Sequence, residues 1–406
     1  MRKIDTGNFR RATRSTAREV NRQILLELVR EHQPISRADL ARRMNLGRGT
    51  VTELVNVLLA EGEIYEGATA MAPRGRRPTL LHIRTRDRFV VGVDVRFSRT
   101  SLMLADFAGR QLALESFETP LNAPELLVGE LGVRVKRLLE SNGAVENCHG
   151  IGVVVPGVVD REAGRVLAAP QLGWGEYELV AALEAATGMP VAIENAPMAC
   201  ALAHLWLGAN GRNTENFVYV TVADGVGVGV VANGQIVRGH GSTAGEFGHI
   251  PIEPNGPLCR CGSRGCLEAC TSNLATLARY LGYDFSDREN HRRLHDSQFT
   301  MQDLIARFRS GDARAKAALE ETARYLGIGL AVLVNGLNPG RIFVGGEIAA
   351  AWDLVEPILR QAIESRALTR AAGATPITPE PATEHPRLRG AMALVVAPVF
   401  AAPQLA

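Results

Sequence analysis

The sequence has no apolar run that approaches the roughly 18 residues needed by a membrane-spanning helix. Its beginning, MRKIDTGNFRRATR, contains no apolar stretch of the kind that forms the core of a secretion signal. These absences argue against membrane insertion and against export. We therefore expect a soluble protein of the cytoplasm.

The chain is also not uniform in charge. At 406 residues it is longer than one average domain, so two or three domains are expected, and its 46% hydrophobic content is enough for sizeable cores. Residues 1–88 hold 18 Lys and Arg against 10 Asp and Glu, a net of +8, whereas the remainder holds 27 against 33, a net of −6. A basic first fifth on an acidic body predicts a polyanion-binding module joined to something else.

That basic segment has the pattern of a helix-turn-helix. Apolar residues at helical spacing predict a helix over 21–30, which Pro34 ends. Ser36 then caps a helix over 37–44, which stops at Asn45-Leu46-Gly47, where Gly47 is expected to supply a left-handed turn residue. A third helix starts near Arg48, and strands over 63–67 and 79–83 would form a wing.

The outward side chains of this segment are candidates for contacts to DNA bases and phosphates. A helix-turn-helix can also be a protein–protein module, but the net charge and the basic wing tip favour DNA. We expect a flexible basic arm over 1–15 and a DNA-binding domain over 16–86. The candidate DNA-binding residues are Arg37, Arg48, Thr50, Thr52, Asn56, Arg74, Arg76 and Arg77.

Cysteine is scarce, with six residues, yet three of them fall within eight positions. Cys259, Cys261 and Cys266, with His249 upstream, supply the ligands of a closed tetrahedral zinc site, which is typically structural. Two glycines between the sulfurs permit the tight turn that such a site needs. Two other interpretations stay open: reduced thiols buried as small apolar side chains, as expected for Cys148, and a disulfide.

From Arg88 onward strands and helices alternate, which predicts an α/β fold with mixed sheets. Residues 283–313 are interpreted as surface helices, with His291 and His295 on a solvated face rather than at a metal. Residues 376–386 are expected to form a proline-rich surface turn. The apolar segment 388–400 is expected to pack back on the N-terminal module.

Several motifs together resemble the ROK family, which contains bacterial sugar kinases and sugar-responsive repressors. The motifs are E-x-G-H at 246–249, C-x-C-G-x-x-G-C-x-E at 259–268, and the R-G-R-x-P wing tip at 74–78. The resemblance covers about residues 35–400. It implies a two-lobed actin-like ATPase fold with a ligand in the cleft between the lobes.

The resemblance also implies a sugar site. Asn195, Glu246, His249 and Glu268 match family positions that bond sugar hydroxyls, and Gly157 matches the glycine of the neighbouring P-G turn. Buried carboxylates and amides of this kind discriminate strongly among sugars. The alternative is that these residues only brace the zinc loop.

The phosphotransfer motifs of the family kinases are altered. Where the kinases have D-x-G-G-T, this chain places Arg96 and Phe97, and Ala196 replaces the catalytic aspartate. Asp224 and Glu347 stand where the kinases favour threonine and glycine. An alanine cannot accept a hydroxyl proton, so we expect no enzyme activity.

The combined prediction is a sugar-responsive transcriptional regulator, with the output assigned to repression by analogy. A winged helix-turn-helix would precede a kinase-like body over 87–406 with a zinc loop at 249–266. Its partners would be operator DNA, a sugar or sugar phosphate, one structural zinc per chain and a second or further copy in a homodimer or homotetramer. Two alternatives stay open: an active sugar kinase with a DNA-binding domain, and a repressor controlled by a protein partner.

Overall fold

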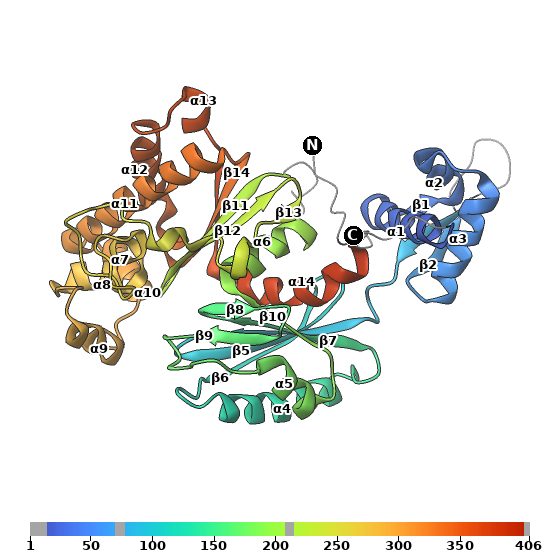
Figure 1. The fold of residues 1–406 in the computed structure, drawn as a ribbon, viewed down its shortest axis with the longest axis horizontal. Coiled ribbons are helices and arrows are strands. Elements are labelled where there is room, and N and C mark those ends of the chain that lie inside the picture. Colours follow the sequence, from blue (N-terminus) through green and yellow to red (C-terminus); the bar gives the residue numbers. More distant parts are fainter. Residues whose placement is uncertain (1–13, 70–77, 208–214, 402–406) are drawn as a thin grey trace.

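The structure is a computed structural model that describes residues 14–69, 78–207 and 215–401, arranged as an N-terminal module and two lobes (Figure 1). The module combines three helices with a small antiparallel sheet of order β1-β3-β2. Its elements are α1 (Arg14–His32), β1 (Ile35–Ser36), α2 (Arg37–Met44), α3 (Arg48–Ala60), β2 (Ile64–Thr69) and β3 (Thr79–Ile83).

The helix-turn-helix forms from local capping interactions. The Ser36 hydroxyl accepts a hydrogen bond from the Asp39 backbone N–H (3.2 Å), and α2 has the predicted bounds. The predicted turn residue was wrong, because Asn45 (φ 50°) is left-handed while Gly47 is extended and precedes α3 as its N-cap. An asparagine side chain is polar and short enough to tolerate that conformation.

The start of the module also differs from the prediction. Helix α1 begins at Arg14, so Arg14 and Ser15 belong to the helix rather than to the flexible arm expected over 1–15. Residues 1–13 and the predicted wing tip at 70–77 lie outside the described residues.

The two lobes share one strand topology, which confirms the predicted two-lobed α/β body. In each, the first three strands are antiparallel. The fourth strand pairs in parallel with the first, and the fifth pairs in parallel with the fourth. The N-lobe sheet contains β4 (Phe89–Val95), β5 (Arg99–Asp106), β6 (Gln111–Glu118), β7 (Cys148–Val155) and β10 (Val191–Asn195). The C-lobe sheet contains β11 (Phe217–Val222), β12 (Val226–Ala232), β13 (Gln235–Ile236), β14 (Arg341–Gly346) and β15 (Ile377–Glu380).

Strand β15 corrects the interpretation of 376–386 as a surface turn. Its residues Ile377–Glu380 pair in parallel with β14 at the edge of the sheet, the position where a proline such as Pro379 is tolerated.

No helix in the described part of the chain is long and apolar enough to cross a membrane. The remaining helices cover the lobes. They are α4 (Pro124–Ser141), α5 (Leu179–Thr187), α7 (Leu267–Thr271), α8 (Asn273–Leu281), α9 (Arg288–Asp296), α10 (Met301–Arg309), α11 (Ala313–Leu337), α12 (Trp352–Glu364) and α13 (Arg370–Gly373).

Two further helices connect the lobes. Helix α6 (Ala196–Leu207) follows the last N-lobe strand but packs on β11 and β12, whereas α14 (Pro386–Phe400) follows the last C-lobe strand but packs on β4 and β7 (Figure 1). The helices also pack on each other through small residues. A Cβ on Gly390 would lie 2.6 Å from the Ala199 carbonyl carbon, so this contact requires glycine.

Helix α14 also packs against the N-terminal module, as predicted for 388–400. Its apolar residues join one hydrophobic cluster with the core of the module and with β4 and β5. Gln23 donates a hydrogen bond to the Val399 carbonyl (2.8 Å), and the Arg30 guanidinium lies over the Phe400 ring (5.6 Å). The module is therefore joined to the body by a shared core.

Candidate metal centre and ligand cleft

Four of the predicted ligands converge at one point of the C-lobe. The ligand atoms of His249, Cys259, Cys261 and Cys266 all lie within 4.8 Å of one another. The Cys259 Sγ lies 3.6 Å from the His249 Nδ1, and the Cys261 Sγ lies 3.6 Å from the Cys266 Sγ. Ligands bound tetrahedrally at zinc distances would be separated by roughly 3.5–3.8 Å. The group therefore fits a metal ion, and all four described thiols of the C-lobe, Cys270 included, are free.

A tight loop brings these ligands together. The Cys259 N–H donates to the Ser263 carbonyl (2.8 Å), and bridges join Leu258 to Arg264 and Pro251 to Cys266. Gly265 has φ +65°, and a Cβ there would lie 1.6 Å from the Glu253 carbonyl oxygen. Glycine is therefore required between the second and third sulfurs.

The electrostatics of the group suit a cation. A hydrogen bond to Cys259 raises the pKa of His249 to about 9. Burial would raise the pKa of Cys261, but the Ser263 backbone and the neighbouring thiols bring it down to about 7. Burial and the neighbouring thiols raise the pKa of Cys266, so a bound cation would have to displace its proton.

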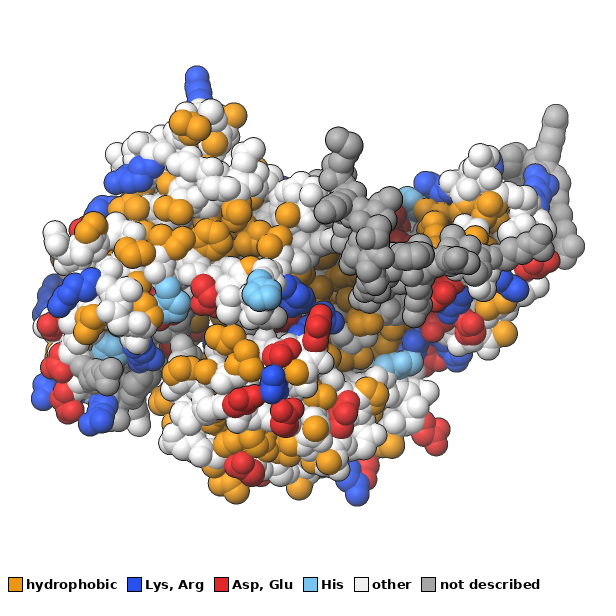
Figure 2. All heavy atoms as spheres, in the orientation of Figure 1, with side chains coloured by type: hydrophobic (Ala, Val, Ile, Leu, Met, Phe, Trp, Pro, Cys, Tyr) orange, Lys and Arg blue, Asp and Glu red, His pale blue; other side chains and the backbone are white. Residues whose placement is uncertain are grey.

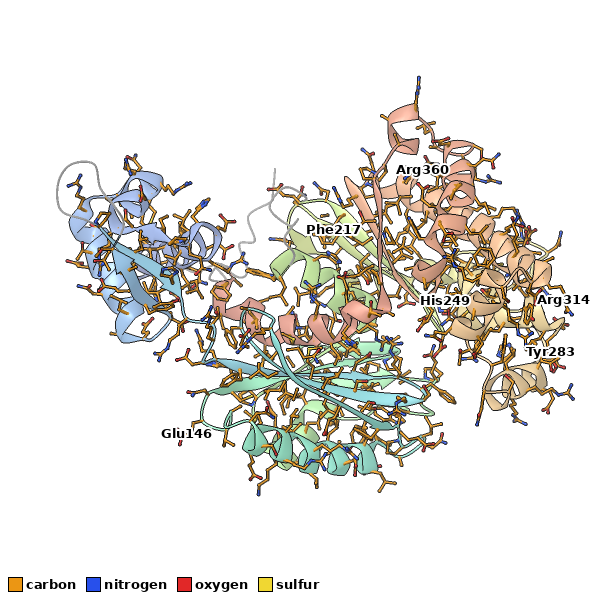
Figure 3. All side chains as sticks on the ribbon, turned by 180° about the vertical axis from the view of Figure 1, so that it is seen from behind. Glu146, Phe217, His249, Tyr283, Arg314 and Arg360 are labelled. Carbon is orange, nitrogen blue, oxygen red and sulfur yellow. The ribbon has the colours of Figure 1, made fainter. Side chains whose placement is uncertain are left out.

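The cleft between the lobes contains a cavity of about 360 Å³, which we call the inner cavity. Both lobes line it, and Figure 3 shows His249 on the side of the C-lobe that faces the N-lobe. All five residues predicted to bind sugar line this one cavity: Gly157, Asn195, Glu246, His249 and Glu268.

His249 connects the metal group with the inner cavity. Its Nδ1 faces the Cys259 sulfur, while its Nε2 lies 3.8 Å from a Glu246 carboxylate oxygen. Burial raises the pKa of Glu246. Glu268, at the start of α7, accepts a hydrogen bond from the Val226 backbone N–H (3.0 Å). Two carboxylates and one imidazole can thus bind hydroxyl groups in the same space.

The N-lobe supplies the remaining two residues. The Asn195 side chain is 9% exposed and its Oδ1 accepts the Met198 N–H (3.2 Å), so the start of α6 orients it. Gly157 has φ +94°, and a Cβ would lie 2.1 Å from the Ala168 carbonyl oxygen. Gly157 is therefore explained by this backbone contact whether or not it touches a ligand.

A chain of ion pairs crosses the cleft beside Ala196, and the sequence interpretation missed it. The Asp94 carboxylate accepts from the Arg387 Nε (2.6 Å) and from the Arg96 Nε (2.9 Å). Arg96 extends to the other lobe, where its Nη1 lies 3.3 Å from Glu347, which in turn accepts from the Asn273 amide (2.9 Å). Arg96, Ala196, Glu347 and Arg387 all line the inner cavity.

The predicted DNA-binding residues on the module differ in exposure. Arg48, Thr50, Thr52 and Asn56 are exposed on α3, although the Thr52 hydroxyl donates to the Arg48 carbonyl (2.8 Å). Arg37 is half-buried and ion-paired with Glu66 on β2 (2.6 Å), so its charge is partly engaged within the module. Figure 2 shows Lys and Arg side chains interspersed with Asp and Glu on the surface of the module. Arg74, Arg76 and Arg77 lie outside the described residues.

The solvated face predicted for His291 was wrong. Its side chain is 9% exposed, and its Nε2 lies 2.6 Å from the Phe285 carbonyl oxygen. Its Nδ1 lies 3.3 Å from the Nε of Arg260. Arg260 belongs to the segment 249–266 that carries the four candidate ligands, which we call the metal loop. The side chain of His295 lies outside the described residues.

Residues 90–397 match the ROK family. The chain is 28% identical over 386 residues to the xylose repressor of Bacillus subtilis (strain 168), a match that covers 95% of this chain and 97% of the repressor. It is also 28% identical over 379 residues to the DNA-binding transcriptional dual regulator NagC of Escherichia coli (strain K12), covering 93% of this chain and 92% of NagC.

Solved structures give the same picture. A ROK family transcriptional regulator, described as a homologue of the E. coli MLC protein, superposes with a TM-score of 0.79 at 25% identity and covers 95% of this chain and 97% of its own. The ROK hexokinase from Thermus thermophilus superposes with a TM-score of 0.60 at 29% identity, and covers 99% of its own chain but only 77% of this one. The regulator thus matches this chain over a greater length than the kinase does.

Proposed function

The chain belongs to the ROK family, and we propose that it is a sugar-responsive transcriptional regulator without phosphotransfer activity. Its N-terminal module would bind operator DNA, and its two-lobed body would bind a sugar or sugar phosphate. The relatives that it matches over nearly its full length are a xylose repressor and NagC, and repression is the output that we assign. It would act in the cytoplasm, where the DNA lies and thiols stay reduced.

The observation that carries the proposal is the composition of the inner cavity. Glu246, His249 and Glu268 meet there with Asn195, so a sugar ring would find acceptors and donors for several hydroxyls. Leaving such buried polar groups unmatched is costly, and the cavity therefore discriminates among ligands by the pattern of their hydroxyls.

We further propose that the same cavity does not support phosphotransfer. Ala196, at the start of α6, cannot take a hydroxyl proton. Arg96 brings a guanidinium and two carboxylate partners, Asp94 and Glu347, into the region where the kinase motifs hold phosphates. The absence of glycine at 96 and 97 would prevent the close backbone approach that a triphosphate needs.

We assign one structural zinc per chain to His249, Cys259, Cys261 and Cys266. Bound zinc would supply charge neutralisation and a rigid crosslink, because all four ligands come from the protein and leave no open position. The ion would hold the His249 ring so that its Nε2 side stays directed at Glu246 and the cavity.

The proposed DNA contacts are Arg48 and Asn56 on the exposed surface of α3, together with Arg74, Arg76 and Arg77, which lie outside the described residues. A single helix-turn-helix reads one half-site, so regulators of this design work as symmetric oligomers. We accordingly propose a homodimer or homotetramer in which the distance between two modules decides whether an operator is bound.

Sugar binding would reach the module through α14. Arg387 at the beginning of this helix lines the inner cavity, and Val399 near its end accepts the hydrogen bond from Gln23 of α1. A ligand that favours one angle between the lobes would shift α14 and with it the module. Such a signal requires different sugar affinities in the two arrangements.

The direct test is binding of the full-length protein to DNA from upstream of its own gene, followed by fluorescence anisotropy during titration with free and phosphorylated sugars. Release by one sugar is the expected result. Tight DNA binding that no sugar alters would replace sugar control with control by a protein partner. Formation of ADP from ATP and a sugar would overturn the non-enzymatic assignment.

A further inference from the structure

A second cavity opens beside the inner cavity. It has a volume of about 510 Å³, and we call it the outer cavity. The two cavities share a set of lining residues and therefore adjoin each other. The shared residues are Phe97, Pro170, Gln171, Asp224 and Arg260.

The outer cavity is built from both lobes and from the metal loop. Phe97 follows β4 and Pro170 follows β9 (Arg165–Ala168) in the N-lobe. Leu258 of the metal loop lies opposite, together with Phe285 and Arg292, the latter on α9. Any group that fills the outer cavity therefore touches both lobes at once.

The lining has the chemistry of a saccharide surface. Phe97 and Phe285 offer aromatic rings, and Leu258 leaves 37% of its surface exposed. The carbon-bound hydrogens of a sugar ring, or an aromatic aglycone, would pack on such side chains. Around them stand Arg260 and Arg292, whose N–H groups donate to hydroxyl oxygens.

Arg260 is exposed but has a hydrogen-bonding partner in His291. His291 lies with its Nε2 2.6 Å from the Phe285 carbonyl, which requires a proton on Nε2. Its Nδ1 then accepts from the Arg260 Nε (3.3 Å). The buried neutral imidazole thus fixes the guanidinium at the boundary between the two cavities.

We propose that the outer cavity is a second subsite and that the effector is a two-unit glycoside, a disaccharide or an aryl glycoside, rather than a free monosaccharide. This inference rests on the proposed sugar-sensing function. The inner cavity, at about 360 Å³, lies at the small end of ligand pockets, which span roughly 300–1,000 Å³. One sugar ring would occupy it, and the second unit would lie on Phe97.

The test is isothermal titration calorimetry of the full-length, zinc-loaded protein. The probes are glucose, xylose and N-acetylglucosamine, each compared with its β-1,4-linked disaccharide and its 4-nitrophenyl β-glycoside. For the sugar that fits, the two-unit probe is expected to bind at least about tenfold more tightly than the free sugar. Whether the disaccharide or the aryl glycoside binds better identifies the second unit.

Two variants change the lining of the outer cavity and leave that of the inner cavity intact, although Arg292→Ala also removes a surface ion pair with Glu289 (3.6 Å). Leu258→Ala and Arg292→Ala alter exposed side chains, and the hydrogen bond from the Leu258 backbone N–H to Ser286 (2.9 Å) persists. Each is expected to weaken the two-unit probe by roughly fivefold while leaving the free sugar within about twofold. Leu258→Trp, which fills the cavity, should block the two-unit probe alone. Leu368→Ala, at a side chain 88% exposed and outside the lining of either cavity, is the matched control.

The outcomes separate this inference from the proposed function. A free sugar that binds as tightly as its glycosides, and releases DNA, would overturn the second subsite while leaving sugar sensing intact. Binding of no probe by a protein that retains zinc and binds DNA would overturn both. Equal losses for free sugar and glycoside in Leu258→Ala would assign that residue to the stability of the metal loop instead.

Discussion

Removal of the metal should destabilise the C-lobe far more than removal of a comparable buried sulfur. The chosen change is Cys266→Ala, which deletes one proposed ligand. Its matched control is Cys270→Ala, because Cys270 lies one helical turn further on, is equally buried at 1% exposure against 0%, and stands outside the ligand group. Burial raises the pKa of Cys270 to about 11, so this residue is a neutral thiol.

The magnitude follows from the loop that the ligands close. A crosslink between His249 and Cys266 closes a loop of about 18 residues, which restricts the unfolded chain by about 3 kcal/mol at 25 °C. For a unit of 150–250 residues, such as the C-lobe, 1 kcal/mol corresponds to about 2–4 °C, so a fall of about 6–12 °C in Tm is expected. The control loses only packing of its sulfur.

The assay combines differential scanning calorimetry with metal analysis by mass spectrometry. Wild type and Cys270→Ala should each carry one zinc per chain, whereas Cys266→Ala should carry little and melt early. A chelator should lower the Tm of wild type toward that of Cys266→Ala. If Cys266→Ala has lost its zinc and still melts with the control, zinc has no structural role here and the reasoning is wrong.

Four further predictions concern single side chains. Arg48→Ala should weaken DNA binding. If Arg48 contacts a phosphate, all sequences should be bound more weakly and the salt dependence of binding should fall by about one counterion; if it contacts a base, discrimination at that base pair should fall. Glu347→Gln breaks a partly exposed ion pair (3.3 Å) between the lobes, worth about 1 kcal/mol, so sugar affinity should change by about fivefold in calorimetry. Ala196→Asp should still produce no ADP, because Arg96 and Phe97 remain; turnover would contradict the assignment. Burial favours a raised pKa for Glu380, but the hydrogen bond with His204 (3.1 Å) lowers the pKa overall. The contribution of Glu380 to the free energy of unfolding is therefore present above about pH 4.5 and is lost as the pH falls through the lowered pKa. Glu380→Gln should accordingly make the Tm less sensitive to acid.

Local rules predicted the elements that local interactions determine. The cap at Ser36 needs only a residue three positions on, and α2 was found with the predicted bounds. The convergence of His249, Cys259, Cys261 and Cys266 was also within reach, because their spacing limits how the loop can turn. Strand β15 escaped prediction because Pro379 and the flanking Pro376 and Pro381 favour a turn, and only its neighbour β14 selects the strand.

Long-range contacts account for what could not be predicted. Arg387 and Asp94 are separated by 293 positions, and Arg96 and Glu347 by 251, so no local pattern pairs them. The buried position of His291 depends on Arg260 and the Phe285 carbonyl, which the topology brings together. The cleft residues were predicted only through the family resemblance, since nothing in their spacing brings Asn195 near Glu268.

The core shared by α1 and α14 has a consequence for synthesis. Leu25 and Leu26 leave the ribosome hundreds of residues before Leu388, Met392 and Phe400, with which they form one cluster. The DNA-binding module therefore emerges early but lacks part of its packing surface until the sensor behind it has been translated. A nascent or truncated chain would present a module with an uncovered apolar face. The module can therefore complete its packing against α14 only after the whole body has been synthesised.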